Sequence, residues 1–243
     1  MDYSNLEVNI SSRIIDDKTQ MAQLQAGLNI HDENTLTFFG MKKGAEFFKE
    51  YRDVSKMIQF GRLLYGGTDR GIYTKVKTDV PDCPLTFKEF VKAVENYFID
   101  HPDFVPWMEK VQELAIKERI SVNGYGRVRS LYNDERSIKR QALNNPNQGT
   151  AGDFMTETMI LLDEALAETK TDMVLQVHDE LIFNVPDSEL ETSIPLIESV
   201  MNREVELNGY TFRIPVDSEL GTHWSEQGEF DRVTFKVIGK SKH

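Results

Sequence analysis

Apolar residues recur along this chain at intervals that predict alternating extended and helical segments. Leu6, Val8 and Ile10 occupy every second position and predict a short strand, which a helix over residues 16–28 follows. Within residues 44–64 the apolar positions have a helical spacing and predict a helix with one buried face. The first part of the chain is therefore expected to run from a strand into helices.

The middle of the chain is expected to be mainly helical. Residues 85–120 predict two helices that divide near Pro102 and Pro106, since proline disrupts the interior of a helix. Residues 121–132 contain glycine between two β-prone runs and predict a hairpin. Residues 147–169 predict a long amphipathic helix.

The last third of the chain combines strands and helix. Residues 171–186 form two β-rich runs around the polar triplet HDE at 178–180, which places these side chains at a hairpin tip. Residues 190–207 predict another helix, and residues 211–220 predict a closing strand. Helices with an antiparallel sheet make a mixed α+β fold the expected class.

Length and composition are those of an ordinary folded protein. The chain has 243 residues, 40% of them hydrophobic, enough for one large domain or two smaller ones. No apolar run approaches the roughly 18 residues that span a bilayer, and no signal peptide is evident, so a soluble protein without a membrane partner is expected. The single cysteine, Cys83, precludes an internal disulfide. A net charge of -12, taken alone, argues against nucleic-acid binding.

Two carboxylates, Asp2 and Asp179, each stand beside a hydrophobic run, far apart in the sequence. Out of context, the triplet HDE has the composition of a solvated hairpin loop, and the DYS at residues 2–4 has that of a helix cap or Asx-turn. Neither stretch establishes chemistry by itself.

Two polar clusters indicate affinity for phosphates and bases. Arg52, Lys56 and Phe60 share one helical face and suit a polyphosphate with a sugar or base against the ring, although a solvated face with one core aromatic has the same pattern. The second cluster suits base edges and phosphates, although it also has the composition of a loop that leads into a helix. Its members are Lys139, Arg140, Asn144, Asn147, Gln148 and Gly149.

Four stretches, taken together, resemble a known family. "DYSNLE", "RDVSKMIQFGRLLYG", "RQALNNPNQGTAGD" and "QVHDE" occur in the order and rough spacing of the polymerase motifs of A-family DNA polymerases, the bacterial DNA polymerase I family. "GLNIHDENTLTFFG" and "GYGRVRSL" are similar to linking segments of that family, and the resemblance covers roughly residues 2–224. It implies template-directed DNA synthesis, in which dNTPs are added to a primer 3′-hydroxyl.

The resemblance also implies an architecture: a palm whose antiparallel sheet carries the catalytic acids, and a helical fingers subdomain. The expected divisions are residues 1–30 and 126–225 for the palm, 31–125 for the fingers and 226–243 for a C-terminal extension. The chain starts at the first motif, so the thumb and exonuclease regions are expected to be absent from it. A partner, an N-terminal polymerase fragment, is expected to supply the thumb, the rest of the palm and, where it has one, an exonuclease.

The carboxylates are implied to be metal ligands. By the resemblance, Asp2 and Asp179 hold two Mg²⁺ ions, with Mn²⁺ able to substitute, and the carbonyl of Tyr3 completes the shell. Glu180 is implied to be an auxiliary acid. Asp2, Asp179, Glu180 and Lys56 make up the expected catalytic set, with Lys56 placed to protonate the leaving pyrophosphate.

The resemblance implies two binding sets. The residues expected to bind the incoming dNTP are Glu7, His31, Arg52, Lys56, Phe60 and Tyr65. In that set Phe60 packs on the sugar, Glu7 acts with it to exclude a 2′-hydroxyl, and Tyr65 stacks on the template. For primer-template DNA, Arg140, Asn144 and Gln148 contact the duplex, while Gln176 and His178 lie near the primer terminus. A local basic track offsets the acidic net charge. Its members are Arg127, Arg129, Arg136, Lys139 and Arg140.

Two positions depart from the family pattern. Tyr65 lies nine residues beyond Lys56 instead of eight, and about 100° per residue turns it to the opposite face of a regular helix. Either a π-bulge restores the face or the role assigned to Tyr65 is wrong. Asn9 stands where relatives commonly have arginine, which weakens any local phosphate contact.

Two other functions compete with polymerisation. A non-catalytic polymerase remnant that binds nucleotide or DNA as an interaction module would have little reason to keep both acids and both cations. A metal-dependent nuclease or phosphatase explains Asp2 and Asp179 but leaves Arg52, Lys56 and Phe60 without a role. By analogy with small variant polymerases, the cytoplasm of a bacterial or phage-infected cell is the expected location.

Overall fold

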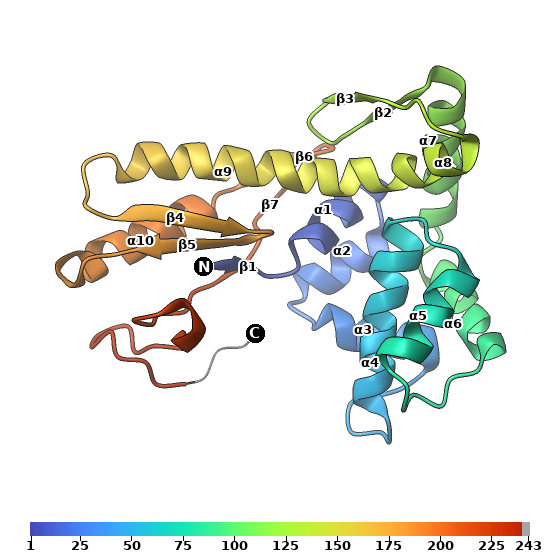
Figure 1. The fold of residues 1–243 in the computed structure, drawn as a ribbon, viewed down its shortest axis with the longest axis horizontal. Helices are drawn as coiled ribbons and strands as arrows, with labels where there is room; N and C mark the ends of the chain where they lie inside the picture. The colour runs from blue at the N-terminus through green and yellow to red at the C-terminus, as the bar shows by residue number, and fades with distance from the viewer. Residues whose placement is uncertain (240–243) are drawn as a thin grey trace. The chain divides into compact units, whose positions relative to one another are not determined.

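The structure, a computed structural model, describes residues 1–239 and divides into two compact units. Unit 1 comprises Met1–Leu6 and Ala151–His243, and unit 2 comprises Glu7–Thr150. Figure 1 shows the order of the helices and strands along the chain. Residues 240–243, at the end of the predicted C-terminal extension, lie outside the described residues.

Unit 2 is built mainly from helices. These are α1 (Leu6–Ile15), α2 (Lys18–Gln25), α3 (Ile30–Phe39), α4 (Phe48–Met57), α5 (Asp69–Asp79), α6 (Phe87–Asp100), α7 (Phe104–Glu118) and α8 (Glu135–Asn144). The other elements are the π-helical segments Ile58–Leu64 and Asn145–Gly149 and the antiparallel strands β2 (Ile120–Val122) and β3 (Val128–Ser130). The helices predicted within residues 44–64 and 85–120, and the hairpin predicted within residues 121–132, are confirmed.

The predicted strand at Leu6, Val8 and Ile10 is wrong, because these residues lie in helix α1. This helix is buried on nearly every side, so its apolar residues do not follow a single helical stripe. Its intervening polar residues are buried too. The hydroxyls of Ser11 and Ser12 donate hydrogen bonds to backbone carbonyls one turn earlier. Because its polar side chains are hydrogen-bonded, α1 can be buried although apolar and polar residues alternate in it as they do in a strand.

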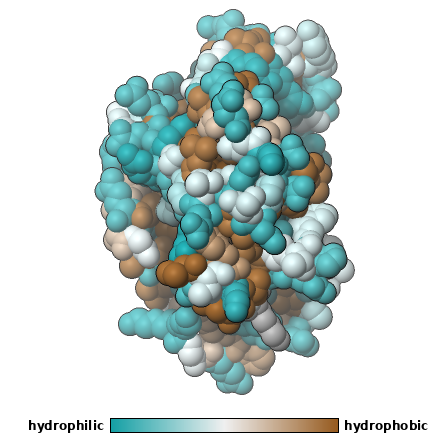
Figure 2. Space-filling view, turned by 90° about the vertical axis from the view of Figure 1, so that its left-hand side faces the viewer, coloured by the Kyte–Doolittle hydropathy of each residue, from teal (hydrophilic) through white to brown (hydrophobic). Residues whose placement is uncertain are grey.

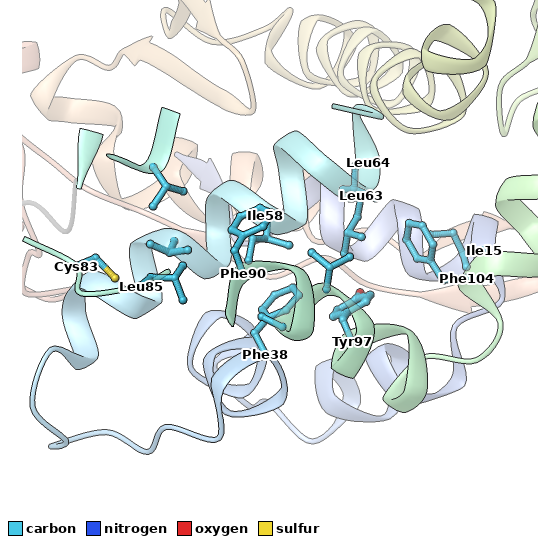
Figure 3. Close-up of a cluster of buried hydrophobic side chains, with 14 residues drawn as sticks. Ile15, Phe38, Ile58, Leu63, Leu64, Cys83, Leu85, Phe90, Tyr97 and Phe104 are labelled. Carbon is cyan, nitrogen blue, oxygen red and sulfur yellow. The ribbon is translucent and has the colours of Figure 1, made fainter. Parts of the chain in front are cut away.

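The core of unit 2 is a cluster of buried side chains from most of its helices (Figure 3). Its members are Ile15, Phe38, Val54, Ile58, Leu63, Leu64, Val76, Cys83, Leu85, Phe90, Ala93, Val94, Tyr97 and Phe104. Aromatic stacking contributes to it, since the ring centroids of Phe38 and Tyr97 lie 5.0 Å apart. Burial in this cluster raises the pKa of the Cys83 thiol.

Replacing Phe90 with alanine is expected to lower the free energy of unfolding by about 3–5 kcal/mol, because the ring is fully buried and packs against Tyr73 and Phe87. Urea unfolding followed by circular dichroism measures the loss. The matched control is Ile99→Ala on the same helix, where the residue is 70% exposed and the expected change is below about 0.5 kcal/mol. Equal losses in the two variants would contradict this assignment of the core.

A buried polar pair joins the start of α2 to the end of α6. Asp17 caps α2 by accepting the Gln20 backbone N–H, and its second oxygen lies 2.7 Å from Nδ1 of His101. The His101 ring stacks on Tyr97 with centroids 4.0 Å apart. Burial, followed by the Asp17 charge, raises the pKa of Tyr97 well above its usual value, so the phenol stays neutral.

Unit 1 combines helices with a four-stranded antiparallel sheet. Its helices are α9 (Thr150–Leu166) and α10 (Leu190–Met201), and its strands are β1 (Asp2–Tyr3), β4 (Asp172–Val177), β5 (Glu180–Asn184), β6 (Val205–Leu207), β7 (Tyr210–Phe212) and β8 (Val216–Asp217). Short 3-10 turns occur at Asp187–Glu189 and Trp224–Glu226. The sheet order β4-β5-β1-β8 places the first strand of the sequence between strands from the far end of the chain. The predicted α+β class, helix within 147–169 and hairpin within 171–186 are confirmed.

The predicted helix over residues 190–207 ends at Met201, and the part beyond it is extended. Strand β6 pairs with β7 through the turn Asn208-Gly209, in which both residues have positive φ, 52° and 78°. Asn-Gly is the pair that such tight turns favour, so the sequence did contain the signal for this hairpin. The predicted closing strand over residues 211–220 is likewise divided, since β7 and β8 belong to different sheets.

Tyr3 fixes strand β1 against the helices of unit 1. Its side chain is buried, and its hydroxyl donates to the carbonyl oxygen of Met201 at 2.9 Å. Its ring meets Phe154 of α9 edge-on, with centroids 5.1 Å apart. Burial raises the pKa of Tyr3, so the hydroxyl remains a donor. Because successive side chains of a strand point to opposite faces, Asp2 faces away from these helices.

The described part of the predicted extension, residues 226–239, packs against unit 1. Gly228 forms an antiparallel bridge with Leu220, and Phe230 is buried. Arg232 donates to both carboxylate oxygens of Glu198 on α10, at 2.6 and 2.7 Å. These contacts tie the extension to the same helix that holds Tyr3.

The surface mixes polar and apolar residues. On the face shown in Figure 2, brown apolar residues lie interspersed with teal polar ones. Among the described helices, none is both long enough and apolar enough to cross a bilayer.

Candidate active site

The register of the sheet in unit 1 brings three carboxylates onto adjacent strands. Asp2 lies directly opposite Glu180 in β5 and directly opposite Asp217 in β8. Opposed residues of antiparallel strands share one face, so these side chains form a row. Asp217 also accepts a hydrogen bond from the Ser4 hydroxyl at 2.6 Å. Neighbouring carboxylates repel each other, so a cation beside the row would stabilise it.

The turn between β4 and β5 places Asp179 beside β1. The Tyr3 backbone N–H donates to the Asp179 carbonyl oxygen at 3.3 Å. His178 has a φ of 55°, a left-handed conformation that is uncommon outside glycine and that occurs often at functional turns. The Gln176 side-chain amide donates to the His178 carbonyl oxygen at 3.1 Å. The sequence segments that hold the predicted acids are thus neighbours in the sheet.

The oxygens at this sheet are of the kind that a hard divalent cation prefers. Mg²⁺ binds carboxylate and carbonyl oxygens, which Asp2, Asp179 and the Tyr3 backbone carry. Within residues 1–239, no three Asp, Glu, His or Cys side chains converge closely enough to hold an ion. The donor chemistry therefore fits Mg²⁺, and the ligand set stays a prediction.

In unit 2, helix α4 carries the two predicted phosphate-binding cations, Arg52 and Lys56, on one face. Nε of Arg52 donates to Asp32 at 2.6 Å, and this pair is largely shielded, with side chains 25% and 22% exposed. Nζ of Lys56 lies 3.9 Å from Asp53, with side chains 39% and 43% exposed. Lys56 is therefore the more accessible of the two cations.

His31 lies beside this face as a neutral imidazole. Its ring meets the Phe60 ring edge-on, with centroids 6.2 Å apart. Burial lowers the pKa of His31 from 6.5 to about 4, and the charges of Lys56 and Arg52 act in the same direction. The Asp32 carboxylate opposes this shift. At neutral pH the imidazole therefore offers an anion a hydrogen bond and no positive charge.

The His31 environment is expected to make folding less stable in acid. The pKa of His31 is lower in the folded chain than in the unfolded chain. Between pH 6.5 and about 4, His31 is therefore protonated in the unfolded chain and neutral in the folded chain. Stability is unaffected above about pH 6.5 and falls as the pH drops, by at most about 3 kcal/mol near pH 4. Urea unfolding of His31→Gln and the parent at pH 4–8 measures this, with His223→Gln, which changes an exposed histidine, as the control. Parallel pH curves for the parent and His31→Gln would refute the assignment.

The helix widens where the sequence departs from the family spacing. Residues Ile58–Leu64 continue α4 as a π-helix, and the Tyr65 N–H donates to the Phe60 carbonyl oxygen at 2.9 Å, five residues back. The wider turn absorbs the extra residue, so that the Phe60 and Tyr65 ring centroids lie 6.4 Å apart. The π-helix that one alternative requires is thus present, and the template-stacking role of Tyr65 stays a prediction.

Tyr65 also contacts the predicted sugar-gating acid. Its hydroxyl donates to Glu7 at 2.6 Å. The contacts from His31 to Phe60, from Phe60 to Tyr65 and from Tyr65 to Glu7 form one chain within unit 2. Four of the predicted nucleotide-contacting residues are therefore brought together.

The predicted duplex contacts Arg140, Asn144 and Gln148 follow one another at intervals of four along α8 and its π-helical continuation. The Asn144 side-chain amide donates to Oε1 of Gln148 at 2.7 Å. Arg140 and Gln148 are exposed, and Asn144 is half-buried. This stripe can present a cation and two amides to a nucleic acid.

A cavity of about 650 Å³ adjoins the stripe within unit 2. Arg136, Lys139 and Arg140 line one side of it, and the loop at Gly66 lines another. Gly66 has a φ of 66°, and a Cβ there would lie 3.1 Å from Cγ of Arg140, so glycine permits this close approach. Three members of the predicted basic track therefore meet at one cavity.

The sequence pattern of a known family spans these elements. A sequence model described as "DNA polymerase family A" matches residues 1–226. The chain belongs to DNA polymerase family A.

Proteins of family A from several bacteria are similar to this chain. DNA polymerase I of Lactococcus lactis subsp. cremoris (strain MG1363) is 30% identical over 234 residues, which cover 93% of this chain and 25% of that protein. DNA polymerase I of Geobacillus stearothermophilus is 29% identical, over 92% of this chain and 25% of that protein. The chain thus spans about a quarter of the length of the curated relatives it matches.

A solved family A structure has a similar fold. The POL domain of Pol1 from M. smegmatis, in complex with DNA primer-template and dNTP, superposes with a TM-score of 0.74 at 26% identity. The match covers 89% of this chain and 37% of that chain.

Asn9, where the resemblance led us to expect arginine, is buried in α1. Arg13, one turn later, donates to its carbonyl oxygen and to its side-chain oxygen, both at 3.2 Å. Burial lowers the pKa of Arg13 to about 10, which still leaves it charged at neutral pH. The guanidinium of Arg13, one turn further along α1, therefore places a positive charge beside Asn9.

Three residues of these sites were missed by the sequence analysis: Asp217, Asp32 and Asn29. Asp217 is opposite Asp2 only because of a pairing between distant strands. Asn29 and Asp32 did have a local signal, since an asparagine three residues before an acid marks a helix start. Their contact with Arg52 depends on the packing of α3 on α4.

Proposed function

We propose that this family A chain carries the nucleotidyl-transfer centre of a DNA polymerase, which adds dNTPs to a primer 3′-hydroxyl as a template directs. The observation that carries the proposal is the register of β1, which sets Asp2 opposite Glu180 and hydrogen-bonds Tyr3 to the Asp179 backbone. The similar Pol1 domain, described in complex with DNA primer-template and dNTP, supports the same substrates here.

Asp2, Asp179 and the Tyr3 carbonyl would hold two Mg²⁺ ions, with Mn²⁺ able to substitute. When bound, these ions would supply Lewis-acid polarisation of the reacting phosphate and ease deprotonation of the primer hydroxyl. Glu180 would be an auxiliary acid on the same face of the sheet. The buried Tyr3 side chain would keep Asp2 oriented, because its hydroxyl is anchored on Met201.

Unit 2 would bind the triphosphate. The guanidinium of Arg52 would pair with phosphate oxygens through two N–H groups, and the compact ammonium of Lys56 would neutralise charge on the leaving pyrophosphate. Lys56 would also give that group a proton as it departs. Neutral His31 would add a hydrogen bond.

The contact chain from Phe60 to Glu7 would select the sugar. Phe60 would pack on the deoxyribose, and the Glu7 carboxylate would close the space that a 2′-hydroxyl needs. The Tyr65 hydroxyl donates a hydrogen bond to Glu7 at 2.6 Å. Tyr65 would also stack on the template, as the π-helix returns its ring to the Phe60 side.

The exposed stripe on α8 would contact primer-template DNA through Arg140, Asn144 and Gln148, and Gln176 and His178 would lie near the primer terminus. Locally gathered cations allow this on a chain with a net charge of -12. Binding through phosphate contacts falls steeply as salt rises.

We propose that residues 1–30 and 126–225 form the palm, residues 31–125 the fingers and residues 226–243 a C-terminal extension. The two compact units divide after residues 6 and 150, so residues 7–30 and 126–150 belong to the mainly helical unit. Because the chain spans about a quarter of its relatives' length, the thumb-bearing remainder would act with it, on the same polypeptide or on an N-terminal partner fragment.

Primer extension tests the proposal. The chain is incubated with a labelled primer-template, dNTPs and Mg²⁺, alone and together with an N-terminal polymerase segment that carries a thumb. Template-directed extension with the segment present, and its loss in Asp2→Ala, are the expected results. DNA or nucleotide binding without extension in any combination would instead identify a non-catalytic binding module.

A further inference from the structure

Arg52 is already paired with an anion of the protein itself. Its Nε donates to Oδ1 of Asp32 at 2.6 Å, and its Nη2 donates to Oδ1 of Asn29 at 3.3 Å. These two nitrogens form one edge of the guanidinium, an edge that binds a phosphate through two parallel hydrogen bonds. A phosphate that approaches this edge therefore finds it occupied.

The start of helix α3 fixes the two acceptors in place. Asn29 is the N-cap, and its side chain accepts the Asp32 backbone N–H at 3.2 Å. Asp32 lies in the first turn, where the positive end of the helix stabilises a carboxylate. The carboxylate is therefore held next to Arg52 by secondary structure, and it does not swing freely in solvent.

Within residues 1–239, the second predicted cation, Lys56, has no acid as close as the one beside Arg52. Lys56 lies 3.9 Å from Asp53, beyond hydrogen-bonding distance, and both side chains are more exposed than the Arg52 pair. Solvent therefore screens the Lys56–Asp53 pair more strongly than the Arg52–Asp32 pair. Of the two predicted phosphate-binding cations, Arg52 is therefore the one that has a carboxylate at hydrogen-bonding distance in residues 1–239.

We propose that Asp32 is a competing anion, which a triphosphate has to displace from Arg52 before it is fully bound. This inference rests on the proposed function, because it takes Arg52 as a triphosphate ligand. The carboxylate then lowers the affinity for free triphosphate and determines the concentration at which the site fills.

The opposite role, in which Asp32 aids binding by orienting Arg52, is separable by chemistry. Asparagine at position 32 keeps the shape of the side chain and an oxygen that accepts the Nε hydrogen, so it keeps the orientation. It removes only the negative charge. That charge acts on every phosphate of the ligand, whereas loss of orientation concerns a single side chain.

Calorimetric titration of the whole chain with inorganic tripolyphosphate measures the effect. Asp32→Asn is expected to bind about 3- to 10-fold more tightly than the parent, since a nearby like charge is removed. Glu33→Gln is the matched control: it removes the same charge from the next residue of α3, no hydrogen bond or ion pair to Arg52 is recorded for Glu33 in residues 1–239, and less than about a twofold change is expected. In the background of Arg52→Ala, the gain from Asp32→Asn should fall to the size of the Glu33→Gln effect, because the competition for Arg52 is gone and only the weaker general effect of the charge is left.

The outcomes separate this inference from the proposed function. If the parent binds tripolyphosphate through Arg52 but Asp32→Asn binds equally or less tightly, the competing-anion role is wrong and the triphosphate site stands. If neither protein binds, and Arg52→Ala changes nothing, the triphosphate site itself is wrong and the inference falls with it. Circular dichroism and thermal melting of each variant verify that the fold is retained.

Discussion

Asp179→Ala is expected to lower nucleotide addition by at least about 10³-fold while the fold remains intact. The carboxylate would be one of the two that hold the metal ions, so its removal takes away stabilisation of charge at the reacting phosphate. The fold should survive, because alanine keeps the backbone carbonyl that accepts the Tyr3 N–H of β1. Single-turnover primer extension with Mg²⁺ and a thumb-bearing N-terminal segment measures the rate.

Asp172→Ala is the matched control for this change. Asp172 begins the same hairpin, is exposed, and lies at the opposite end of β4 from the turn. The Asp172→Ala variant should extend the primer at the rate of the parent protein. Substantial residual incorporation by Asp179→Ala, in a protein with unchanged circular dichroism, would defeat the two-metal assignment.

Changes at Lys56 are expected to separate binding from proton transfer. Lys56→Met should reduce the rate of incorporation by about 10²- to 10⁴-fold, because it removes both the charge and the acid. Lys56→Arg should keep much of the affinity for dNTP yet lose most of the rate, since a guanidinium is too weak an acid to give up a proton. Pre-steady-state kinetics, which give the dNTP affinity and the maximum rate separately, distinguish the two effects.

Lys75→Met is the control for Lys56. Lys75 is also a helical lysine in unit 2, 3.9 Å from an acid one turn away, and it is exposed. Its replacement should leave both affinity and rate unchanged. If Lys56→Arg were as fast as the parent, Lys56 would act through its charge alone.

Local patterns in the sequence predict a large part of this fold. The hairpin with Asp179 at its tip and the helix with Arg52 and Lys56 on one face depend on residues close in sequence, whose spacing matches the period of a strand or a helix. Resemblance to the polymerase motifs then identified the family, which the match over residues 1–226 confirms.

Long-range pairing is what the sequence did not reveal. The insertion of β1 between β5 and β8, and hence the position of Asp217 opposite Asp2, depends on a register between segments at opposite ends of the chain. The strand predicted in α1 was wrong, because buried, hydrogen-bonded polar residues alternate there with apolar ones as they would in a strand. The pair of Arg52 with Asp32 needs two helices to pack before it exists.

The π-helix at Ile58–Leu64 is a place where this helix holds one more residue per turn while the Phe60 and Tyr65 rings stay in contact. An additional residue in α4 itself would rotate everything that follows by about 100°, carrying Phe60 away from Arg52 and Lys56. Placed after Phe60, the same addition is taken up by one looser turn, and the aromatic partner returns to its neighbour. A chain with one residue fewer between the phenylalanine and the tyrosine could therefore present the same pair of rings, with an α-helical turn in place of the π-helical one.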